Sequence, residues 1–522
     1  TYDGLGNLIS QTSPDTGTTR FSYDAAGNRS SAVDARGVVV NYTYDAINRL
    51  TAVNYPAAAT ENVIYTYDTN SSANYGIGRL TKVAIGSTSV SYGYNYLGLV
   101  AQKTSVVNGI TKSVTYTYDK AGNLTSMTYP SGRIINYTRD NAGRVQAVKT
   151  KVNSSAAEQT VISTVNYLPF GPTNSFTYGN GLTHTLSYDN DYRLTDIVLG
   201  GLLKRTYNYD AADNITKIID GVTSTKTQTF TYDNLDRLSS ANGTYGYQAF
   251  SYDAIGNRTG FLGDNGTGIL SDTYTYEATS NRLSRIDKTK AGVANGTRNF
   301  TYDTAGNLVQ GTADDGSAQA YTFNNTNRLA TAKVNTNLVG TYTYNALGQR
   351  VSKTYADNTK ELFHYDEAGQ LIAVTNASGT TQREYIYNGS ILVGYINAGV
   401  LSYVHNDHHK APQMVTNAAK QVIWAADYQP FGKINAVTNT IEIYSRFPGQ
   451  VSDSETGLYY NWFRFYDPSI GRYLTSDPIG LEGGINTYAY ANVNPLRFID
   501  PNGSKAAMSG GGTYPNLFDA HP

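Results

Sequence analysis

Val114-Thr-Tyr-Thr-Tyr-Asp-Lys-Ala-Gly-Asn-Leu124 is the stretch of sequence that decides the fold. Side chains alternate between the two faces of a β-strand, so the valine and both tyrosines share one face and the threonines share the other. The aspartate can fold its carboxylate onto nearby backbone N–H groups, and the Gly-Asn pair tolerates the positive φ of a tight reversal. The stretch therefore predicts a strand, a hairpin turn and a second strand that begins at Leu124.

This unit recurs along most of the chain as Tyr-Asp, two variable residues, Gly-Asn and then Arg or Leu. The clearest further copies are residues 23–29, 252–258 and 302–308, and most steps between copies are 20 to 24 residues long. With about two strands in each repeat, the pattern predicts an all-β fold with dozens of strands. The tyrosine slots fall at Tyr2, Tyr23, Tyr44, Tyr67, Tyr94, Tyr118, Arg139, Tyr167, Tyr188, Tyr209, Tyr232, Tyr252, Tyr276, Tyr302, Phe323, Tyr344, Tyr365 and Tyr387.

A single hairpin cannot bury its tyrosine face, so neighbouring hairpins must stack into a continuous strip of twisted sheet. Such a strip leaves edges open to aggregation unless it coils and one turn meets the next. Charged residues make up only 16% of the chain, which suits a sheet whose two faces are both partly wet. We therefore expect residues 1–395 to form a spiral β-sheet shell.

Composition and charge argue against several function classes. The chain has 40 Lys and Arg residues and 41 Asp and Glu residues. Because basic residues are not in excess, we expect no nucleic-acid partner. The chain has no cysteine, which excludes disulfides, thiolate metal sites and a cysteine nucleophile. The apolar run Ile391–Ile396 is far too short for a membrane span. Because Thr1-Tyr2-Asp3 opens in mid-repeat, we expect the sequence to be a fragment of a longer chain.

An aromatic-rich segment without the repeat follows residue 395. It contains the tetrapeptide Asp-Pro-x-Gly twice, starting at Asp477 and at Asp500, 23 positions apart. Each copy can be a turn, in which Asp binds backbone N–H groups, Pro fixes φ and Gly supplies a positive φ. Two carboxylates that share a site can instead hydrolyse a peptide, because one keeps its proton while the other activates water. We divide the chain into residues 1–395, residues 396–504 and a flexible tail, 505–522.

The repeats resemble the YD repeats of bacterial Rhs proteins, of the C components of insecticidal toxin complexes and of teneurins. Residues 405–408, 428–432, 457–467, 471–481 and 500–503 resemble the Rhs-associated core domain. The resemblance implies a spiral β cocoon that encloses a C-terminal toxin and is plugged by the core domain, residues 396–504. It also implies a bacterial protein that is made in the cytoplasm and secreted. The implied cargo is the chain's own toxin segment, and the implied partners are secretion machinery or an N-terminal shell component.

The resemblance further implies an aspartyl autoprotease that acts once, just after the second Asp-Pro-x-Gly. Asp477 and Asp500 match the catalytic aspartates, and the bond to be cut is Ser504–Lys505. Ser504 stands where the family usually has leucine. Arg472 could orient a carboxylate and lower its pKa, or it could bond to backbone carbonyl groups. Hydrolysis by two carboxylates needs no metal or thiol, and we expect no cofactor.

Two alternatives stay open at this point. His405, His408 and His409 with Asp407 are residue types that bind metals, but on a strand they point to opposite faces, so we favour a turn with polar packing. The function could also be that of an extracellular cell-surface or carbohydrate-binding scaffold, in which both aspartates are structural. A related possibility is a shell of the same fold that is catalytically silent.

Overall fold

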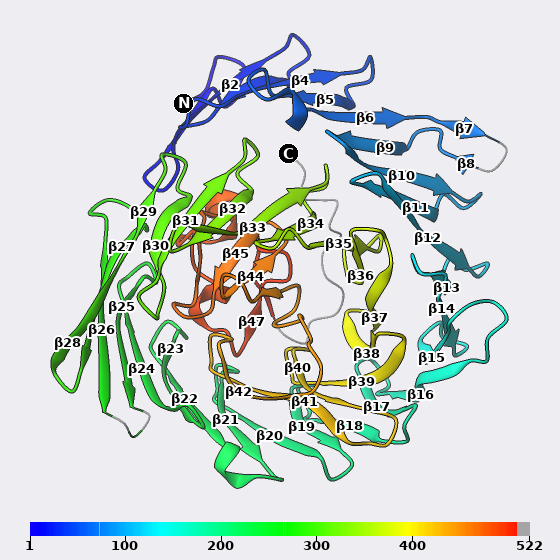
Figure 1. The fold of residues 1–522 in the computed structure, drawn as a ribbon, viewed down its shortest axis with the longest axis vertical. Coiled ribbons are helices and arrows are strands. Elements are labelled where there is room, and N and C mark those ends of the chain that lie inside the picture. The colour runs from blue at the N-terminus through cyan, green and yellow to red at the C-terminus, as the bar shows by residue number, and fades with distance from the viewer. Residues whose placement is uncertain (72–73, 265, 267, 509–522) are drawn as a thin grey trace.

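A computed structural model describes residues 1–71, 74–264, 266 and 268–508 of the chain. The described residues form β-strands and four short 3-10 helices, and the strands pair almost entirely with their neighbours along the chain. Figure 1 shows an outer turn of sheet (residues 10–299), an inner turn (residues 301–439) and the later strands enclosed within both. This arrangement confirms the predicted all-β spiral shell with a plugged centre. In the part of the chain described, no helix has the length and apolar character needed to cross a bilayer.

The outer turn is a 26-stranded antiparallel sheet, and Asn70–Ser71 and Asn74–Tyr75 pair in a separate two-stranded ribbon. Helices η1 (Ala59–Glu61) and η2 (Ser224–Lys226) lie between its strands. The strands are β1 (Ser10–Ser13), β2 (Gly17–Tyr23), β3 (Arg29–Val33), β4 (Val39–Tyr44), β5 (Leu50–Asn54), β6 (Val63–Tyr67), β7 (Asn70–Ser71), β8 (Asn74–Tyr75), β9 (Leu80–Ile85), β10 (Thr88–Tyr94), β11 (Val100–Val107), β12 (Ile110–Tyr118), β13 (Leu124–Thr128), β14 (Ile134–Arg139), β15 (Val145–Lys151), β16 (Gln159–Tyr167), β17 (Thr173–Tyr178), β18 (Thr183–Tyr188), β19 (Leu194–Leu199), β20 (Leu203–Tyr209), β21 (Ile215–Asp220), β22 (Gln228–Tyr232), β23 (Leu238–Gly243), β24 (Gly246–Tyr252), β25 (Arg258–Asp264), β26 (Ile269–Tyr276), β27 (Leu283–Lys290) and β28 (Val293–Asn299).

The inner turn is a 14-stranded antiparallel sheet. Its strands are β29 (Thr301–Tyr302), β30 (Leu308–Thr312), β31 (Ala318–Phe323), β32 (Leu329–Val334), β33 (Asn337–Tyr344), β34 (Arg350–Tyr355), β35 (Lys360–Tyr365), β36 (Leu371–Asn376), β37 (Thr381–Asn388), β38 (Ile391–Asn397), β39 (Val400–Asn406), β40 (Pro412–Thr416), β41 (Val422–Tyr428) and β42 (Ile434–Asn439). Strand pairing thus continues across residue 395, inside β38, and reaches β42. The division of the chain into domains at residue 395 stays a prediction.

Residues 440–504 follow the inner turn, and we call them the plug. The plug holds a four-stranded sheet of β43 (Val451–Asp453), β44 (Leu458–Asn461), β45 (Arg464–Asp467) and β46 (Arg472–Tyr473). Helices η3 (Gly480–Gly483) and η4 (Ala491–Val493) follow this sheet. β47 (Phe498–Ile499) pairs with β48 (Ala507–Met508) just beyond the plug. The predicted tail, 505–522, is described only to residue 508, and the remainder lies outside the described residues.

The residues that recur in each repeat form the hairpin turns. In the repeat at Asp119, the carboxylate oxygen Oδ1 accepts hydrogen bonds from the N–H groups of Ala121 and Asn123, both at 2.9 Å. The side chain of Asn123 donates to Asp119 Oδ2 at 3.0 Å. Gly122 has a φ of 82°, while Asn123 is not in the left-handed region. The turn therefore depends on local contacts alone, which is why the repeat folds the same way wherever it occurs.

The tyrosine that precedes each aspartate links one repeat to the repeat before it. The hydroxyl of Tyr118 donates to the carbonyl oxygen of Val100 at 2.8 Å, and Tyr344 does the same to Leu329. At the irregular copy, the guanidinium of Arg139 donates to the carbonyl of Leu124 at 3.0 Å and 3.2 Å. Regular tyrosine spacing thus reflects a hydrogen bond as well as packing, and arginine fills the slot because it also reaches the carbonyl.

The outer turn and the inner turn of the sheet differ in how deeply their strands are buried. Along β4 in the outer turn, half-buried residues alternate with exposed ones, as expected for a sheet with one wet face. In the inner turn, five consecutive residues of β36 and of β38 are buried. On one face, Ile372 and Val393 belong to the same hydrophobic cluster as Val161 of the outer turn, and on the other face, Val374 and Tyr395 belong to the cluster that includes residues of the plug. A strand covered on both faces needs a continuous apolar run, which explains Ile391–Ile396.

Candidate active site

Both predicted aspartates lie in buried turns of the plug. Asp477 precedes η3, and its Oδ1 accepts a hydrogen bond from the N–H of Ile479 at 3.0 Å. Asp500 follows β47, and its Oδ1 accepts from the N–H groups of Gly503 at 2.9 Å and Ser504 at 3.0 Å. The exposed fractions are 6% for Asp477 and 2% for Asp500. Each Asp-Pro-x-Gly unit is therefore a turn, held by the first oxygen of its aspartate.

The second oxygens of the two aspartates converge on Arg464, the first residue of β45. Arg464 Nη2 lies 2.7 Å from Asp477 Oδ2 and 3.1 Å from Asp500 Oδ2. The hydroxyl of Tyr473 donates to Asp500 Oδ2 at 2.8 Å. The guanidinium carbon of Arg464 lies 3.6 Å from the centroid of the Tyr473 ring. One buried arginine therefore joins two carboxylates that are 23 positions apart in the sequence.

Backbone contacts fix Arg464 and both turns in place. Arg464 Nε donates to the carbonyl oxygen of Gly503 at 2.6 Å, and Nη1 donates to that of Thr487 at 2.9 Å. Asn461, at the end of β44, is fully buried and donates to the Asp500 carbonyl at 2.8 Å. The guanidinium thus uses all three of its nitrogens, which is the geometry that a planar fork of donors favours.

The bond predicted to be cut, Ser504–Lys505, lies in the short loop between β47 and β48. Ser504 is buried, whereas Lys505 is exposed. A Cβ atom built on Gly483 would overlap Asp477 Oδ2 and would lie 2.8 Å from the carbonyl oxygen of Ser504. The Ser504 carbonyl and the Asp477 carboxyl group therefore border the same small space. Glycine at position 483 allows this close approach.

The electrostatics distinguish Asp477. Burial raises its pKa to about 7, and the negative charge of Asp500 acts in the same direction. Arg464 and the N–H of Ile479 oppose this rise. A carboxyl group with such a pKa is partly protonated at neutral pH, so it can donate a hydrogen bond to a carbonyl oxygen.

The predicted supporting residue, Arg472, lies elsewhere. Its Nη2 donates to the carbonyl oxygen of Asn281 at 2.6 Å, and its guanidinium lies 4.8 Å from the centroid of the Tyr488 ring. Bonding to a backbone carbonyl was one of the two roles expected for it. Sequence reasoning missed Arg464, although it lies in a run of four buried residues on β45. A charged residue inside such a run signals a buried ionic partner.

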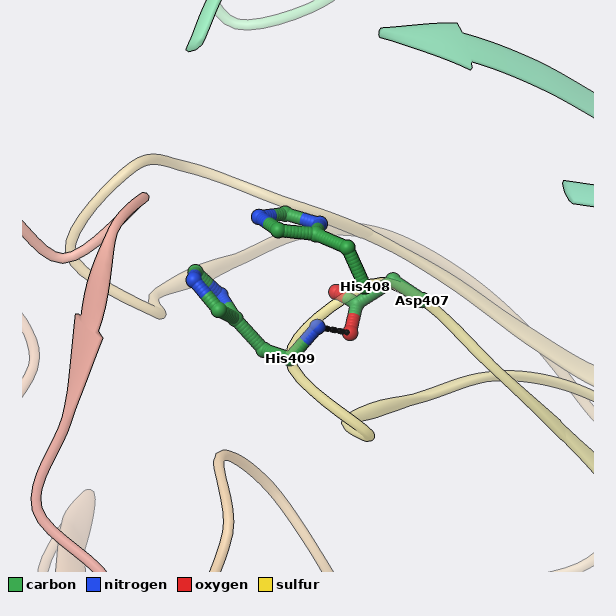
Figure 2. Close-up of side chains that lie close together, drawn as sticks. All are labelled: Asp407, His408 and His409. Atoms are coloured by element: carbon green, nitrogen blue, oxygen red, sulfur yellow. Dashed lines mark hydrogen bonds between the residues drawn. The ribbon is translucent and has the colours of Figure 1, made fainter. Parts of the chain in front are cut away.

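The histidine segment forms a turn between β39 and β40 (Figure 2). Asp407 Oδ1 accepts from the N–H groups of His409 and Ala411, both at 2.9 Å, and Oδ2 accepts from Gln413 at 3.1 Å. Potential ligand atoms of Asp407, His408 and His409 lie within 4.8 Å of one another. His405 points elsewhere and shares a hydrogen bond of 2.8 Å with Thr416.

The two neighbouring imidazoles face each other. Their ring centroids are 3.8 Å apart, with an angle of 37° between the planes. Burial lowers the pKa of His408 to about 4 and that of His409 well below its ordinary value. Burial raises the pKa of Asp407 to about 7. Because nitrogen lone pairs lie in the ring plane, facing rings do not direct them to one point. The hydrogen bonds are those of an Asp-initiated turn with packed polar side chains.

Family comparisons agree with this architecture. The Teneurin YD-shell family matches residues 173–496. The chain belongs to the Teneurin YD-shell family. RHS repeats also match this YD-shell at residues 2–39, 104–134 and 118–154. The longer match contains Arg464 and Asp477 and ends just before Asp500.

Solved structures share the fold of this YD-shell. The crystal structure of TcdB2-TccC3-TEV superposes with a TM-score of 0.75 at 21% sequence identity, over 96% of this chain and 28% of that chain. The Photorhabdus luminescens Tc holotoxin pore with an Asp-to-Ala mutation in TccC3 gives a TM-score of 0.76 at 21% identity, over 98% and 28% of the two chains.

Curated relatives of this YD-shell include toxins. Double-stranded DNA deaminase toxin A of Burkholderia cenocepacia is 27% identical over 96% of this chain and 37% of its own length. Toxin protein Tse5 of Pseudomonas aeruginosa is 37% identical over 20% of this chain and 8% of its own length. The chain thus spans well under half the length of these relatives.

Proposed function

We propose that this YD-shell encloses a C-terminal toxin segment of a secreted bacterial protein and releases it by cutting its own Ser504–Lys505 bond. The observation that carries the proposal is the convergence of Asp477 and Asp500 on one nitrogen of Arg464, next to the Ser504 carbonyl. The toxin names of two relatives support the cargo class, and the enclosed position of the plug supports containment. A shell-forming or secretion component would be its partner.

The geometry suggests one role for each group. Protonated Asp477 donates to the Ser504 carbonyl oxygen, and Asp500, as the base, takes a proton from an attacking water. The water oxygen bonds to the Ser504 carbonyl carbon, and the addition product then breaks its C–N bond. The amine of Lys505 takes the proton that Asp500 removed from water, and Asp477 keeps its own proton, so one water is consumed and two chain ends form. Arg464 holds both carboxylates and the Gly503 carbonyl beside the reacting bond.

Denaturing mass spectrometry of the purified chain tests the proposal. We expect the wild type to yield a separate fragment of residues 505–522, and Asp477→Asn or Asp500→Asn to leave the chain intact. Asp467→Asn is the matched control, because Asp467 also begins an Asp-Pro turn in the plug and its Oδ1 accepts from Ser469. An uncut wild-type chain would overturn the proposal, and glycan binding by that uncut chain would favour the surface scaffold instead.

A further inference from the structure

Thr487 connects the aspartate pair to the beginning of the outer turn. Its carbonyl oxygen accepts hydrogen bonds from Arg464 Nη1 and from the N–H of Asp477, both at 2.9 Å. Its hydroxyl donates to Asp15 Oδ2 at 2.7 Å, across 472 positions of sequence. Asp15 lies in the turn between β1 and β2 and is only 3% exposed. One plug residue therefore contacts the candidate active site with its backbone and the shell with its side chain.

Asn281 and Arg282, near the end of the outer turn, hold Asp15 in place. Its two carboxylate oxygens accept from the backbone N–H of Asn281 at 2.7 Å and from the side chain of Asn281 at 2.8 Å. Arg282 donates to the carbonyl of Asp15 at 2.8 Å and 3.0 Å. Arg472 of the plug donates to the carbonyl of Asn281. The β1–β2 hairpin at the start of the outer turn and the β26–β27 hairpin near its end thus meet at the point where they hold Thr487.

Water can hardly replace the contact between Asp15, Asn281 and Thr487, because all three residues are buried. Asn281 and Thr487 are 7% and 4% exposed. The hydroxyl of Thr487 and the N–H of Asn281 therefore need the Asp15 carboxylate as acceptor, since little water can replace it. Without the carboxylate, Thr487 would shift, and the two donors that its carbonyl binds, Arg464 and the Asp477 backbone, would shift with it.

We propose that Asp15 is a positioning residue for the aspartate pair, so that self-cleavage requires the outer turn to have closed on Thr487. This inference rests on the proposed autoproteolysis. It gives the order of events: hairpins at both ends of the outer turn dock first, and the bond is cut afterwards. A chain whose outer turn is open keeps its Ser504–Lys505 bond, so cargo is severed only inside a closed shell.

The test follows the cleavage rate of the full chain made by cell-free synthesis, quenched in denaturant and measured by mass spectrometry. Thr487→Val keeps the shape of the side chain but removes the hydroxyl that Asp15 accepts. We expect Thr487→Val and Asp15→Asn each to slow cleavage by roughly 10- to 100-fold, the size of effect known for small misplacements of catalytic groups. The double variant should be little slower than either single variant, because both changes break one contact.

Two variants serve as controls. Thr487→Ser restores the hydroxyl and should restore most of the rate. Asp34→Asn loosens a comparable contact of the outer turn, since Asp34 holds Arg36, which donates to the inner-turn carbonyls of Asn324 and Asn325. It does not touch the plug, and its rate should equal that of the wild type.

The pH profile separates positioning from stability. Loosening Arg464 weakens its attraction for the Asp477 carboxylate, so the pH at which the rate declines should move upward in Thr487→Val. If the wild type cuts itself and both Asp15→Asn and Thr487→Val cut at the wild-type rate, the inference is wrong while the proposed function stands. A wild type that stays uncut overturns both.

Discussion

Asp477 and Asp500 each present one oxygen to their own turn and the other oxygen to the same nitrogen of Arg464. The two interpretations of the Asp-Pro-x-Gly repeat are therefore compatible. The turn contacts fix the position of each aspartate, which lets the second oxygens of both reach the same nitrogen of Arg464. Burial raises the pKa of Asp477 to about 7, so this carboxyl group is partly protonated at neutral pH.

Replacing Arg464 should slow cleavage strongly. Arg464→Lys keeps the charge but offers a single ammonium group, which cannot reach both carboxylates and the backbone carbonyls as the guanidinium does. We expect the rate, measured by mass spectrometry after cell-free synthesis, to fall more than about 100-fold. Arg383→Lys is the control, because Arg383 pairs with Glu361 and Glu442 away from the plug aspartates. Rapid cleavage by Arg464→Lys would contradict the role given to the guanidinium.

Cleavage should slow as pH rises through about 7. The pKa of Asp477 is raised to about 7, so the group carries its proton below that pH and loses it above. Because the proposed mechanism needs this proton, the rate should fall about ten-fold for each further pH unit. Time courses across pH 5 to 9 measure the profile. A rate that instead rises through this range would assign the base role to Asp477.

Gly483→Ala should block cleavage while leaving the fold intact. The φ of Gly483 lies outside the left-handed region, so alanine fits the backbone, but its Cβ would occupy the space between Asp477 and the Ser504 carbonyl. We expect cleavage to fall at least about ten-fold through displacement of the reacting groups. Gly4→Ala adds a methyl group where nothing lies within 4 Å and should cut at the wild-type rate. Circular dichroism checks the fold of both variants.

Breaking the buried ion pairs between the inner turn and the plug should lower the free energy of unfolding. Arg350 and Lys353 of β34 both contact Asp453 of β43, and all three are essentially unexposed. Burial opposes ionisation of Asp453, but Arg350 and Lys353 outweigh it and keep its pKa below the ordinary value. Asp453→Asn would remove the carboxylate partner of Arg350 and leave Lys353 with Glu455 alone, at a cost of about 3–5 kcal/mol. Urea unfolding measures this loss of stability, and Asp287→Asn, at the exposed Arg285 pair, is the control that should leave the midpoint of unfolding nearly unchanged.

The tyrosine hydroxyls of the repeats should contribute measurably to stability. Tyr344→Phe removes the donor to the Leu329 carbonyl, which lies in the buried interior of the inner turn. We expect a loss of about 1–2 kcal/mol in the free energy of unfolding, because the carbonyl loses its partner. Tyr23→Phe removes the equivalent bond, to Leu8, at a half-buried position, where water can replace the hydroxyl. A larger loss at Tyr23 than at Tyr344 would argue against this explanation.

The sequence by itself determined the features that depend on near neighbours. Each turn is closed within five residues, as Asp119 and Asn123 illustrate, so the repeat predicts its own hairpin and, by stacking, an all-β spiral. The residue types of the two Asp-Pro-x-Gly units also predict their turns. Family resemblance then indicated Asp477 and Asp500 as a pair.

Only the tertiary structure decided which groups meet across the fold. The sequence offered Arg472 as the arginine near the aspartates, yet packing of β45 places Arg464 there and sends Arg472 to Asn281. The contact between Asp15 and Thr487 spans 472 positions, and no repeat or motif in the sequence predicts it. Local hydrogen bonds follow from residue type and spacing, whereas long-range partners and the pKa of Asp477 depend on which surfaces are buried together.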